Sequence, residues 1–287
     1  MNLELRTEYW DDAEARNAFK SFIHRIHGLD FTEWESRGYW DRAYTPFTFF
    51  KGNRVIASVC IYLLEAVIQG KSTHLVQISG VGTHLDWRRK GLSRQLTNVG
   101  LDWARNRHEG VFLFADQEAI PYYEKCEFTP ISESREYVSA YPTERKPGLN
   151  HLDVTKEADL DRIFSFAQNR SPVSNIFSIL NPKLLMFHAL YTMRTNIYEI
   201  PDLNCLVFMG RKEGVLQIYD ILGEEIPSLK RLYPYLCDTS DLRIEFHFHT
   251  DKLGLKSIES HIINSNHTFI KGSFPLDKPA FPFTSHA

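Results

Sequence analysis

One short segment constrains the fold of this chain more than any other, because within residues 77–96 the sequence pattern changes from strand to helix. The run Ser72 to His84 is rich in β-formers, and a short basic loop with a glycine follows it. Apolar residues then recur at helical spacing, at Leu92, Leu96, Val99 and Trp103. The segment therefore predicts a strand, a tight loop and a helix in direct succession.

The loop of this segment is suited to bind an anion. The start of a helix leaves backbone N–H groups unpaired and carries the positive end of the helix dipole. A glycine, Gly91, lets the backbone approach a ligand closely. Positive side chains cluster at the same point, at Arg88, Arg89, Lys90 and Arg94. We interpret the loop as a pyrophosphate cradle, although it is neither a Walker loop nor a Rossmann GxGxxG turn; the alternative is a surface helix with a basic first turn.

The first half of the chain alternates β-rich and helical patterns. Strands are predicted over residues 3–6, 47–50, 55–68, 72–84, 111–115 and 128–138. Helices are predicted from Asp12 to His27, where Gly28 is a stop signal, and over 92–109 and 119–126. The runs 47–50 and 55–68 flank a Gly52-Asn53 turn and predict a hairpin.

A length of 287 residues suggests two domains, and a stretch rich in Pro, Gly and charge at 141–149 is the predicted boundary. We therefore predict domains at 1–143 and 150–287. In the second half, helices are predicted over 156–169, 184–194 and 227–236, and strands over 197–200, 203–212, 215–222 and 242–248. The second half thus repeats the order of the first in outline.

The composition excludes several classes of partner. A net charge of −3 gives no overall attraction for nucleic acid or an anionic membrane. We find no signal peptide and no apolar run long enough to span a membrane, so we expect a cytoplasmic protein. The four cysteines have no CxxC spacing and are expected to be buried free thiols; they are Cys60, Cys126, Cys205 and Cys237.

Two motifs resemble a known family. Arg88-x-x-Gly91-x-Ser93 is similar to the Q/R-x-x-G-x-G/A signature of the GNAT superfamily of acyl-CoA-dependent N-acyltransferases. The segment Asp116 to Phe128 is similar to that family's N-x-x-A-x-x-F/Y-Y-E-K-x-G-F segment. Both motifs occur in order, separated by a helix and a strand, and the resemblance covers about residues 3–140.

The resemblance implies an α+β fold with a mixed sheet splayed at its middle, where acetyl-CoA would lie between two parting strands. The backbone of Val81, Gly82 and Thr83 would pair with the pantetheine arm. The loop residues Arg88, Arg89, Lys90, Gly91, Leu92, Ser93 and Arg94 would hold the pyrophosphate. Tyr123 would hydrogen-bond to the leaving thiolate or protonate it, because a phenol and a thiolate have comparable basicity, whereas Tyr122 would pack inward.

Three positions depart from the family pattern. Ser93 replaces a smaller residue, and Glu127 stands where a glycine is usual, so we expect a different turn there. Gln77 occupies the position of a glutamate base in some members, and an amide cannot accept the proton. The proton acceptor stays open; the candidates are His84, Asp116, Glu118, Glu65 and a chain of water molecules, and the amine could also be neutral already when it binds.

The tail offers one more candidate for this base. A looser similarity links the chain to enhanced-intracellular-survival-type acetyltransferases, in which a degenerate GNAT-like domain follows the first and a terminal carboxylate enters the active site. Residues 281–287 are rich in Phe and Pro, unlike a frayed end. We therefore consider that the tail returns to the cleft and supplies the Ala287 carboxylate or His286 as the base.

The second half resembles a GNAT domain without its cofactor loop. Glu224 and Glu225 open the helix that follows the strand 215–222 and would repel a pyrophosphate. We expect this domain to shape the acceptor pocket or to form a homodimer interface. His247, His249 and Asp251 do not have convincing metal-ligand spacing, so we predict no metal site.

Together these observations predict an acetyl-CoA-dependent N-acetyltransferase that moves the acetyl group to an amine by direct attack on the thioester. The acceptor, a small molecule or a protein amine, is left open. The alternative is a non-catalytic acyl-CoA-binding or sensing module.

Overall fold

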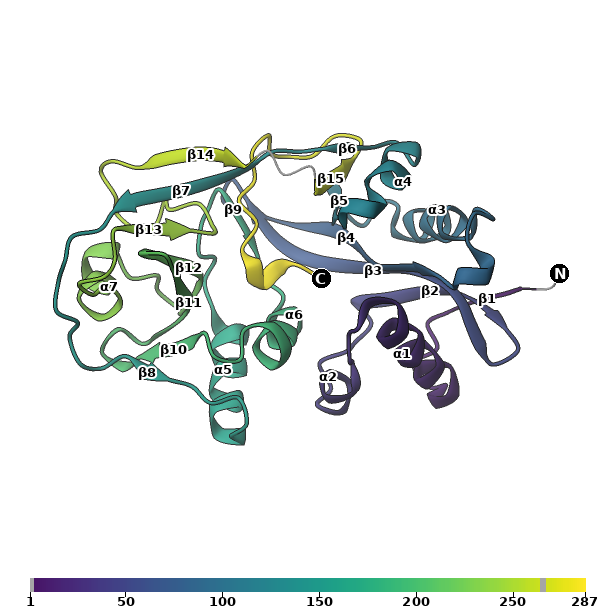
Figure 1. Cartoon of the computed structure of the whole chain (residues 1–287), viewed down its shortest axis with the longest axis horizontal. Coiled ribbons are helices and arrows are strands. Elements are labelled where there is room, and N and C mark those ends of the chain that lie inside the picture. Colours follow the sequence, from purple (N-terminus) through teal and green to yellow (C-terminus); the bar gives the residue numbers. More distant parts are fainter. Residues whose placement is uncertain (1–2, 264–266) are drawn as a thin grey trace.

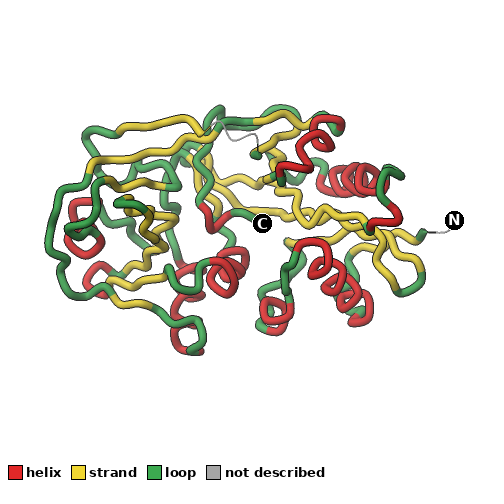
Figure 2. Tube along the Cα trace, in the orientation of Figure 1, coloured by secondary structure: helices red, strands yellow, loops and turns green. Residues whose placement is uncertain are grey.

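The computed structural model describes residues 3–263 and 267–287, which form two mixed sheets flanked by helices (Figures 1 and 2). Among these residues, the first sheet has the order β1 (Glu4–Thr7), β2 (Tyr44–Lys51), β3 (Arg54–Ile68), β4 (Lys71–Thr83), β5 (Gly110–Phe114), β15 (Thr268–Lys271) and β6 (Phe128–Pro130), with β9 (Phe177–Ile179) paired to β3. The second has the order β14 (Glu259–Ile263), β7 (Glu133–Ser139), β13 (Arg243–Phe246), β12 (Val215–Leu222), β11 (Cys205–Lys212), β10 (Ile197–Ile200) and β8 (Asn150–His151). The predicted α+β class with splayed mixed sheets is confirmed.

The helices are α1 (Ala13–His27), α2 (Thr32–Ser36), α3 (Leu92–Ala104), α4 (Ile120–Lys125), α5 (Glu157–Asn169), α6 (Pro182–Phe187) and α7 (Leu229–Leu236). Local signals fix several of their ends. The Asp12 side chain accepts a hydrogen bond from the backbone N–H of Ala15 (3.0 Å) and caps α1. Gly28 ends the same helix in the left-handed conformation (φ 71). No helix of the described residues is long and apolar enough to cross a membrane.

The two halves share one topology. In the first half, β2, β3 and β4 form an antiparallel meander, and β4 runs parallel to β5 after the crossover helix α3. In the second half, β10, β11 and β12 form the same meander, and β12 runs parallel to β13 after α7. The repeat that the sequence suggested in outline is therefore a repeat of connectivity.

The halves exchange strands. β15, close to the end of the chain, lies between β5 and β6 of the first sheet and is antiparallel to both. β7, which precedes the predicted boundary, lies between β13 and β14 of the second sheet. β9 adds to the edge of the first sheet through residues 66–68 of β3. The division into 1–143 and 150–287 stays a prediction about folding units, because each sheet takes strands from both sides of it.

The cores also join the halves. One hydrophobic cluster extends from α1 and α2 in the first half to α5 and α6 in the second. A second cluster packs α3 and α4 against the other face of the first sheet, and a third lies between α7 and the second sheet. Across the joint, Trp34 Nε1 donates to the carbonyl of Lys183 (2.8 Å).

Several predicted elements need correction. The predicted strand 128–138 is two strands, β6 and β7, which belong to different sheets. The predicted helix 184–194 begins earlier, as α6, and ends in a wider π turn at His188–Thr192. The strands β9, β14 and β15 had no prediction, because each is short and depends on a distant partner. All four cysteines are free and buried, as expected.

Candidate functional site

An open groove forms where the first sheet splays. β5 pairs with β4 only from Leu75 to Ile78, whereas β4 continues to Thr83. Beyond that point the β4 edge faces α4 across a groove of about 990 Å³. Val81, Gly82 and Thr83 of β4 line this groove together with the loop residues 87–94, so the residues predicted for cofactor binding lie around one cavity.

Backbone geometry shapes the basic loop. Gly91 caps α3 with φ 74, a left-handed conformation that favours glycine, and a Cβ added there would meet nothing within 4 Å. Arg89 also has a positive φ of 62. Arg88 Nε donates to the carbonyl of Thr83 (3.3 Å), and the Thr83 and Ser93 hydroxyls lie 2.7 Å apart. These contacts tie the loop to the end of β4 and leave the first turn of α3 facing the groove.

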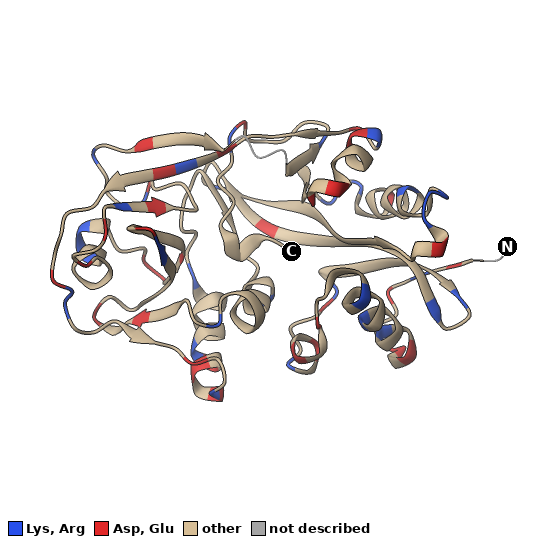
Figure 3. Cartoon of the chain, viewed as in Figure 1, with Lys and Arg blue, Asp and Glu red and all other residues tan. Residues whose placement is uncertain are grey.

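Positive charge surrounds this turn. Arg88, Arg89 and Lys90 are exposed, and Lys90 Nζ lies over the Trp87 ring, 4.7 Å from its centroid. Figure 3 shows the basic residues around the start of α3. The free N–H groups and the dipole at the start of a helix favour a bound anion, and the positive side chains of the loop favour it as well.

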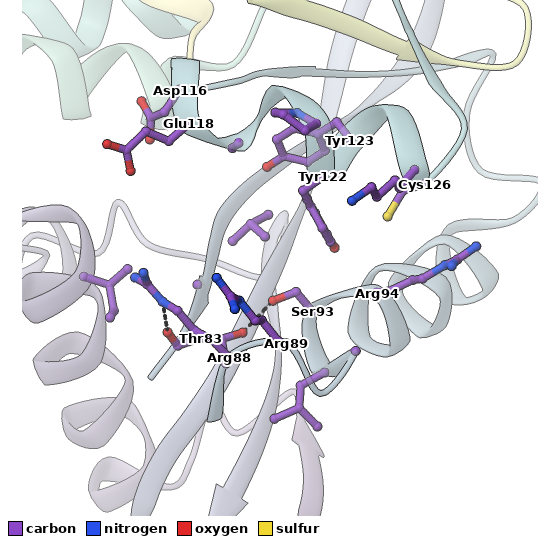
Figure 4. Close-up of a pocket in the computed structure, with 18 of the residues that line it drawn as sticks. Thr83, Arg88, Arg89, Ser93, Arg94, Asp116, Glu118, Tyr122, Tyr123 and Cys126 are labelled. Carbon is purple, nitrogen blue, oxygen red and sulfur yellow. Dashed lines mark hydrogen bonds between the residues drawn. The ribbon is translucent and has the colours of Figure 1, made fainter. Parts of the chain in front are cut away.

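The opposite wall is formed by α4 and the turn before it. Figure 4 shows Tyr122, Tyr123, Asp116 and Glu118 across the groove from Arg88 and Arg89. Tyr123 is 6 % exposed, and its ring packs against Phe128 and Phe269 at centroid distances of 5.8 and 6.1 Å. Burial raises the pKa of Tyr123 well above its ordinary value, so the phenol stays protonated.

A second cavity of about 220 Å³, which we call the aromatic cavity, adjoins the groove. Aromatic side chains contribute a large part of its walls, with Phe31, Trp34, Tyr44, Tyr62, Phe114 and Phe187 among the lining residues. Among the described residues, five line both spaces, and we call them the junction: His27, Val81, Asp116, Ala119 and Tyr123. Tyr122 lines only the groove, where its hydroxyl lies 3.4 Å from Thr97 Oγ1.

The tail reaches this region. Gln77, which is fully buried, donates from Nε2 to the backbone oxygen of Ala287 (3.2 Å), and Ala287 lines the aromatic cavity. His188 Nε2 donates to the His286 carbonyl (2.6 Å), and the His286 ring stacks on Phe114 with 3.8 Å between centroids. The expected return of the tail to the cleft is thus observed. The His286 imidazole faces Phe114 rather than the groove, and burial lowers its pKa to about 3.

The structure separates the candidates for the proton acceptor. Asp116 belongs to the junction, and Glu118 lines the groove. Glu65 and His84 line neither space. His84 instead hydrogen-bonds to Arg54 and lies 3.5 Å from Asp86. Of these four side chains, Asp116 alone faces both the groove and the aromatic cavity.

Sequence reasoning missed His27, the last residue of α1, which belongs to the junction. Its Nε2 is buried without a hydrogen-bond partner in the described structure. Burial lowers the pKa of His27, and the negative charge of Asp116 opposes that shift. The helix pattern gave no signal for it, since a histidine in a last turn is also an ordinary C-terminal residue.

One departure from the family pattern has a structural explanation. Glu127 has φ 61, the conformation that favours glycine, and its side chain lies 3.1 Å from Lys271 Nζ on β15. Glu127 itself adopts the left-handed conformation, so this turn forms here without a glycine. A non-glycine residue bears a cost of about 1–2 kcal/mol in this region.

In the second half, the loop before α7 corresponds to the basic loop before α3, and Ser171 occupies the space beside it. Ser171 donates from its backbone N–H to the carbonyl of Gly223 (2.8 Å) and from its hydroxyl to that of Glu224 (2.5 Å).

His247 and His249 have partners other than a metal ion: His249 Nδ1 lies 3.0 Å from Glu136 Oε1, and His247 packs against Tyr219. In the described ranges, no group of three or more His, Cys, Asp or Glu is placed to hold a metal ion.

Residues 3–128 match the acetyltransferase (GNAT) family. No curated protein sequence matches the chain significantly.

Solved structures resemble almost the whole chain. One is a probable N-acyltransferase from Enterococcus faecalis V583, with TM-score 0.61, 12 % identity, and coverage of 94 % of this chain and 72 % of that one. Another is Eis1 from Mycobacterium abscessus, with TM-score 0.56, 14 % identity, and coverage of 94 % and 73 %. A GCN5-related N-acetyltransferase from Anabaena variabilis ATCC 29413 has TM-score 0.56, 12 % identity, and coverage of 93 % and 72 %. At these identities the similarity shows a shared fold over almost the whole chain.

Proposed function

We propose that this protein is an acetyl-CoA-dependent N-acetyltransferase, because residues 3–128 match the acetyltransferase (GNAT) family. One observation carries the proposal: the basic first turn of α3 and Tyr123 face each other across a groove that shares lining residues with a second cavity. A long co-substrate can lie in the groove while an amine approaches from the aromatic cavity. The two reactants would then meet at the junction.

The groove residues fit coenzyme A in chemistry. The N–H groups at the start of α3 and the side chains of Arg89, Lys90 and Arg94 would hold the diphosphate. Gly91 lets the backbone approach the phosphates, because a Cβ would project into otherwise open space. The backbone of Val81 and Gly82 lies on the β4 edge past its pairing with β5, and it would bind the amide groups of the pantetheine arm.

The proposed reaction is a direct transfer. The nitrogen of a neutral amine bonds to the thioester carbonyl carbon, and the carbon–sulfur bond breaks with its electron pair on sulfur. The nitrogen loses one proton and the sulfur gains one, so protons balance. Positioning at the junction supplies most of the acceleration, as for other reactions of two bound partners.

Tyr123 would act on the leaving sulfur. It lies at the junction and keeps its proton, because burial raises its pKa. A phenol with a raised pKa is a weaker acid than an ordinary one, so its main contribution is a hydrogen bond to the developing thiolate, followed by proton transfer. Tyr122 has no such position, since it does not line the aromatic cavity.

Asp116 would accept the proton of the amine. It is exposed at the junction, and its charge also attracts the ammonium form of an acceptor before it is deprotonated. Gln77 takes no part, because it is buried and donates to the tail. Its presence is accordingly no sign of a decayed enzyme.

The test is a thiol-release assay with acetyl-CoA and a panel of amines. We expect Tyr123→Phe to lower kcat by about 100-fold or more while acetyl-CoA affinity stays within twofold. The matched control is Tyr122→Phe, which should keep nearly full activity. If acetyl-CoA binds but no amine releases thiol, the protein is an acyl-CoA-binding module and the enzymatic proposal is wrong.

A further inference from the structure

The aromatic cavity carries information about the acceptor. Its deep end is a set of rings in mutual contact. Phe31 lies 5.3 Å from Trp34, and both lie 5.7 Å from Tyr44 and from Phe187 between centroids. Tyr62 continues the set at 5.1 Å from Tyr44. These contacts are edge to face, with interplanar angles from 70° to 88°.

Both halves of the chain build this cavity. Leu184 and Phe187 of α6 complete the walls contributed by α2, β2 and β3. Two hydrogen bonds fix α6 in place: Tyr62 OH donates to Asn181 Oδ1 (3.3 Å), and Trp34 Nε1 donates to the Lys183 carbonyl (2.8 Å). Asn181 also caps α6 by accepting from the N–H of Leu184 (2.9 Å). These bonds hold α6 in the cavity wall.

Charge and polarity differ between its two ends. Asp116 at the junction is the single carboxylate side chain among the described residues that line the aromatic cavity, and none of these residues is Lys or Arg. The deep end offers rings and the phenols of Tyr44 and Tyr62. A second positive charge placed there would be desolvated with no carboxylate side chain beside it, and the Ala287 backbone oxygen in this cavity already accepts from Gln77 Nε2 (3.2 Å). A volume of about 220 Å³ is also below the ~300–1,000 Å³ of pockets that hold drug-sized ligands.

We infer that the acceptor is a small monoamine with an aromatic or comparably apolar body, which lies in the aromatic cavity with its nitrogen at the junction, between Asp116 and Tyr123. This inference rests on the proposed acetyl transfer and adds the class of the acceptor. The orientation follows from the chemistry, because the nitrogen must reach the thioester at the junction and the apolar body gains most from the rings. A polyamine, an anionic acceptor or a bulky polycation does not fit this arrangement.

The first test compares three acceptors at saturating acetyl-CoA: 2-phenylethylamine, ethylamine and spermidine. One buried methylene changes kcat/KM by about tenfold, so we expect kcat/KM for 2-phenylethylamine to exceed that for ethylamine by about 100-fold or more. The value for 2-phenylethylamine should also exceed that for spermidine. If spermidine or ethylamine equals or exceeds 2-phenylethylamine, the inference is overturned.

The second test uses Phe187→Ala and Phe187→Leu, with Phe164→Ala as the matched control. Phe164 is partly buried against Tyr39 (4.9 Å between centroids) and lies outside the cavity. We expect Phe187→Ala to raise KM for 2-phenylethylamine about tenfold and to leave KM for ethylamine nearly unchanged, with a smaller rise in Phe187→Leu. An equal rise of KM for 2-phenylethylamine in Phe164→Ala, or no change of KM in either Phe187 variant, would contradict the inference.

A calorimetric titration with acetyl-CoA separates the two levels of the argument. Binding of acetyl-CoA without a preference for 2-phenylethylamine overturns the acceptor class alone. Absence of binding overturns the proposed transferase, and with it the acceptor class.

Discussion

Replacing Phe269 by alanine tests whether the exchanged strand β15 supports the first half of the chain. Phe269 is 1 % exposed and packs against Tyr123, although it lies almost 150 residues later in the sequence. Truncation of a buried phenylalanine costs about 3–5 kcal/mol, a large share of the ~5–15 kcal/mol that stabilises a typical domain. With a urea slope of about 3 kcal/mol/M, the unfolding midpoint should fall by about 1–1.7 M.

The distribution of tryptophans makes this test specific. All five tryptophans, at positions 10, 34, 40, 87 and 103, precede residue 104, so tryptophan fluorescence reports unfolding of the first half. We expect the fluorescence and far-ultraviolet circular dichroism midpoints to fall together. The matched control is Ile262→Ala on β14, where the side chain is 47 % exposed and a change below about 0.5 kcal/mol is expected. An unchanged fluorescence midpoint in Phe269→Ala would refute the reasoning.

Three further outcomes follow from the same structure. A fragment of residues 1–143 should fail to fold as a soluble monomer, because it lacks β15 between β5 and β6; a cooperative unfolding transition of the fragment would contradict this. Burial lowers the pKa of His188 to about 4, below the value of ~6.5 expected in the unfolded chain. As the pH falls from ~6.5 toward 4, the unfolded state therefore takes up a proton that the folded state does not, and the free energy of unfolding should fall by about 3 kcal/mol. The urea midpoint of His188→Gln should accordingly fall less between pH 7 and pH 4 than that of the wild type. Asp116→Asn should lower kcat/KM for an amine by about 100-fold with acetyl-CoA affinity unchanged, and unaltered kinetics would exclude Asp116 as proton acceptor.

Local features of the fold could be predicted from the sequence. Asp12 starts α1 because its side chain caps the helix, and Gly28 ends it because glycine adopts the left-handed conformation. Gly52 likewise favours the turn between β2 and β3. The loop at Gly91 was also predictable, since its charge and glycine lie within one short segment. In each case the physical cause acts over a few residues.

Long-range features could not be predicted in this way. β15 has four residues, and its place in the first sheet depends on pairing with Val111 to Phe114. The tail has no periodicity, yet Phe281 stacks on Phe112 with 4.7 Å between centroids and directs Ala287 to the aromatic cavity. Such contacts depend on how distant segments meet, which a local pattern does not encode.

The junction combines both kinds of feature. Asp116 and Tyr123 belong to a motif that the sequence displays, whereas His27 reaches them only because α1 packs across β4. The aromatic cavity likewise needs α6 from the second half. A search for motifs could therefore locate the groove and not the acceptor cavity beside it.

The central claim is that the turn at the start of α3 binds the diphosphate of coenzyme A, and calorimetry with acetyl-CoA tests it most directly. The decisive comparison is Gly91→Glu with Gly38→Glu, because both glycines have nearly the same φ (74 and 73) and open space around an added Cβ, but Gly38 lies outside the groove. We predict one binding site in the wild type and in Gly38→Glu, and no detectable binding in Gly91→Glu. Absence of heat in the wild type, or equal affinity in all three proteins, would contradict the claim.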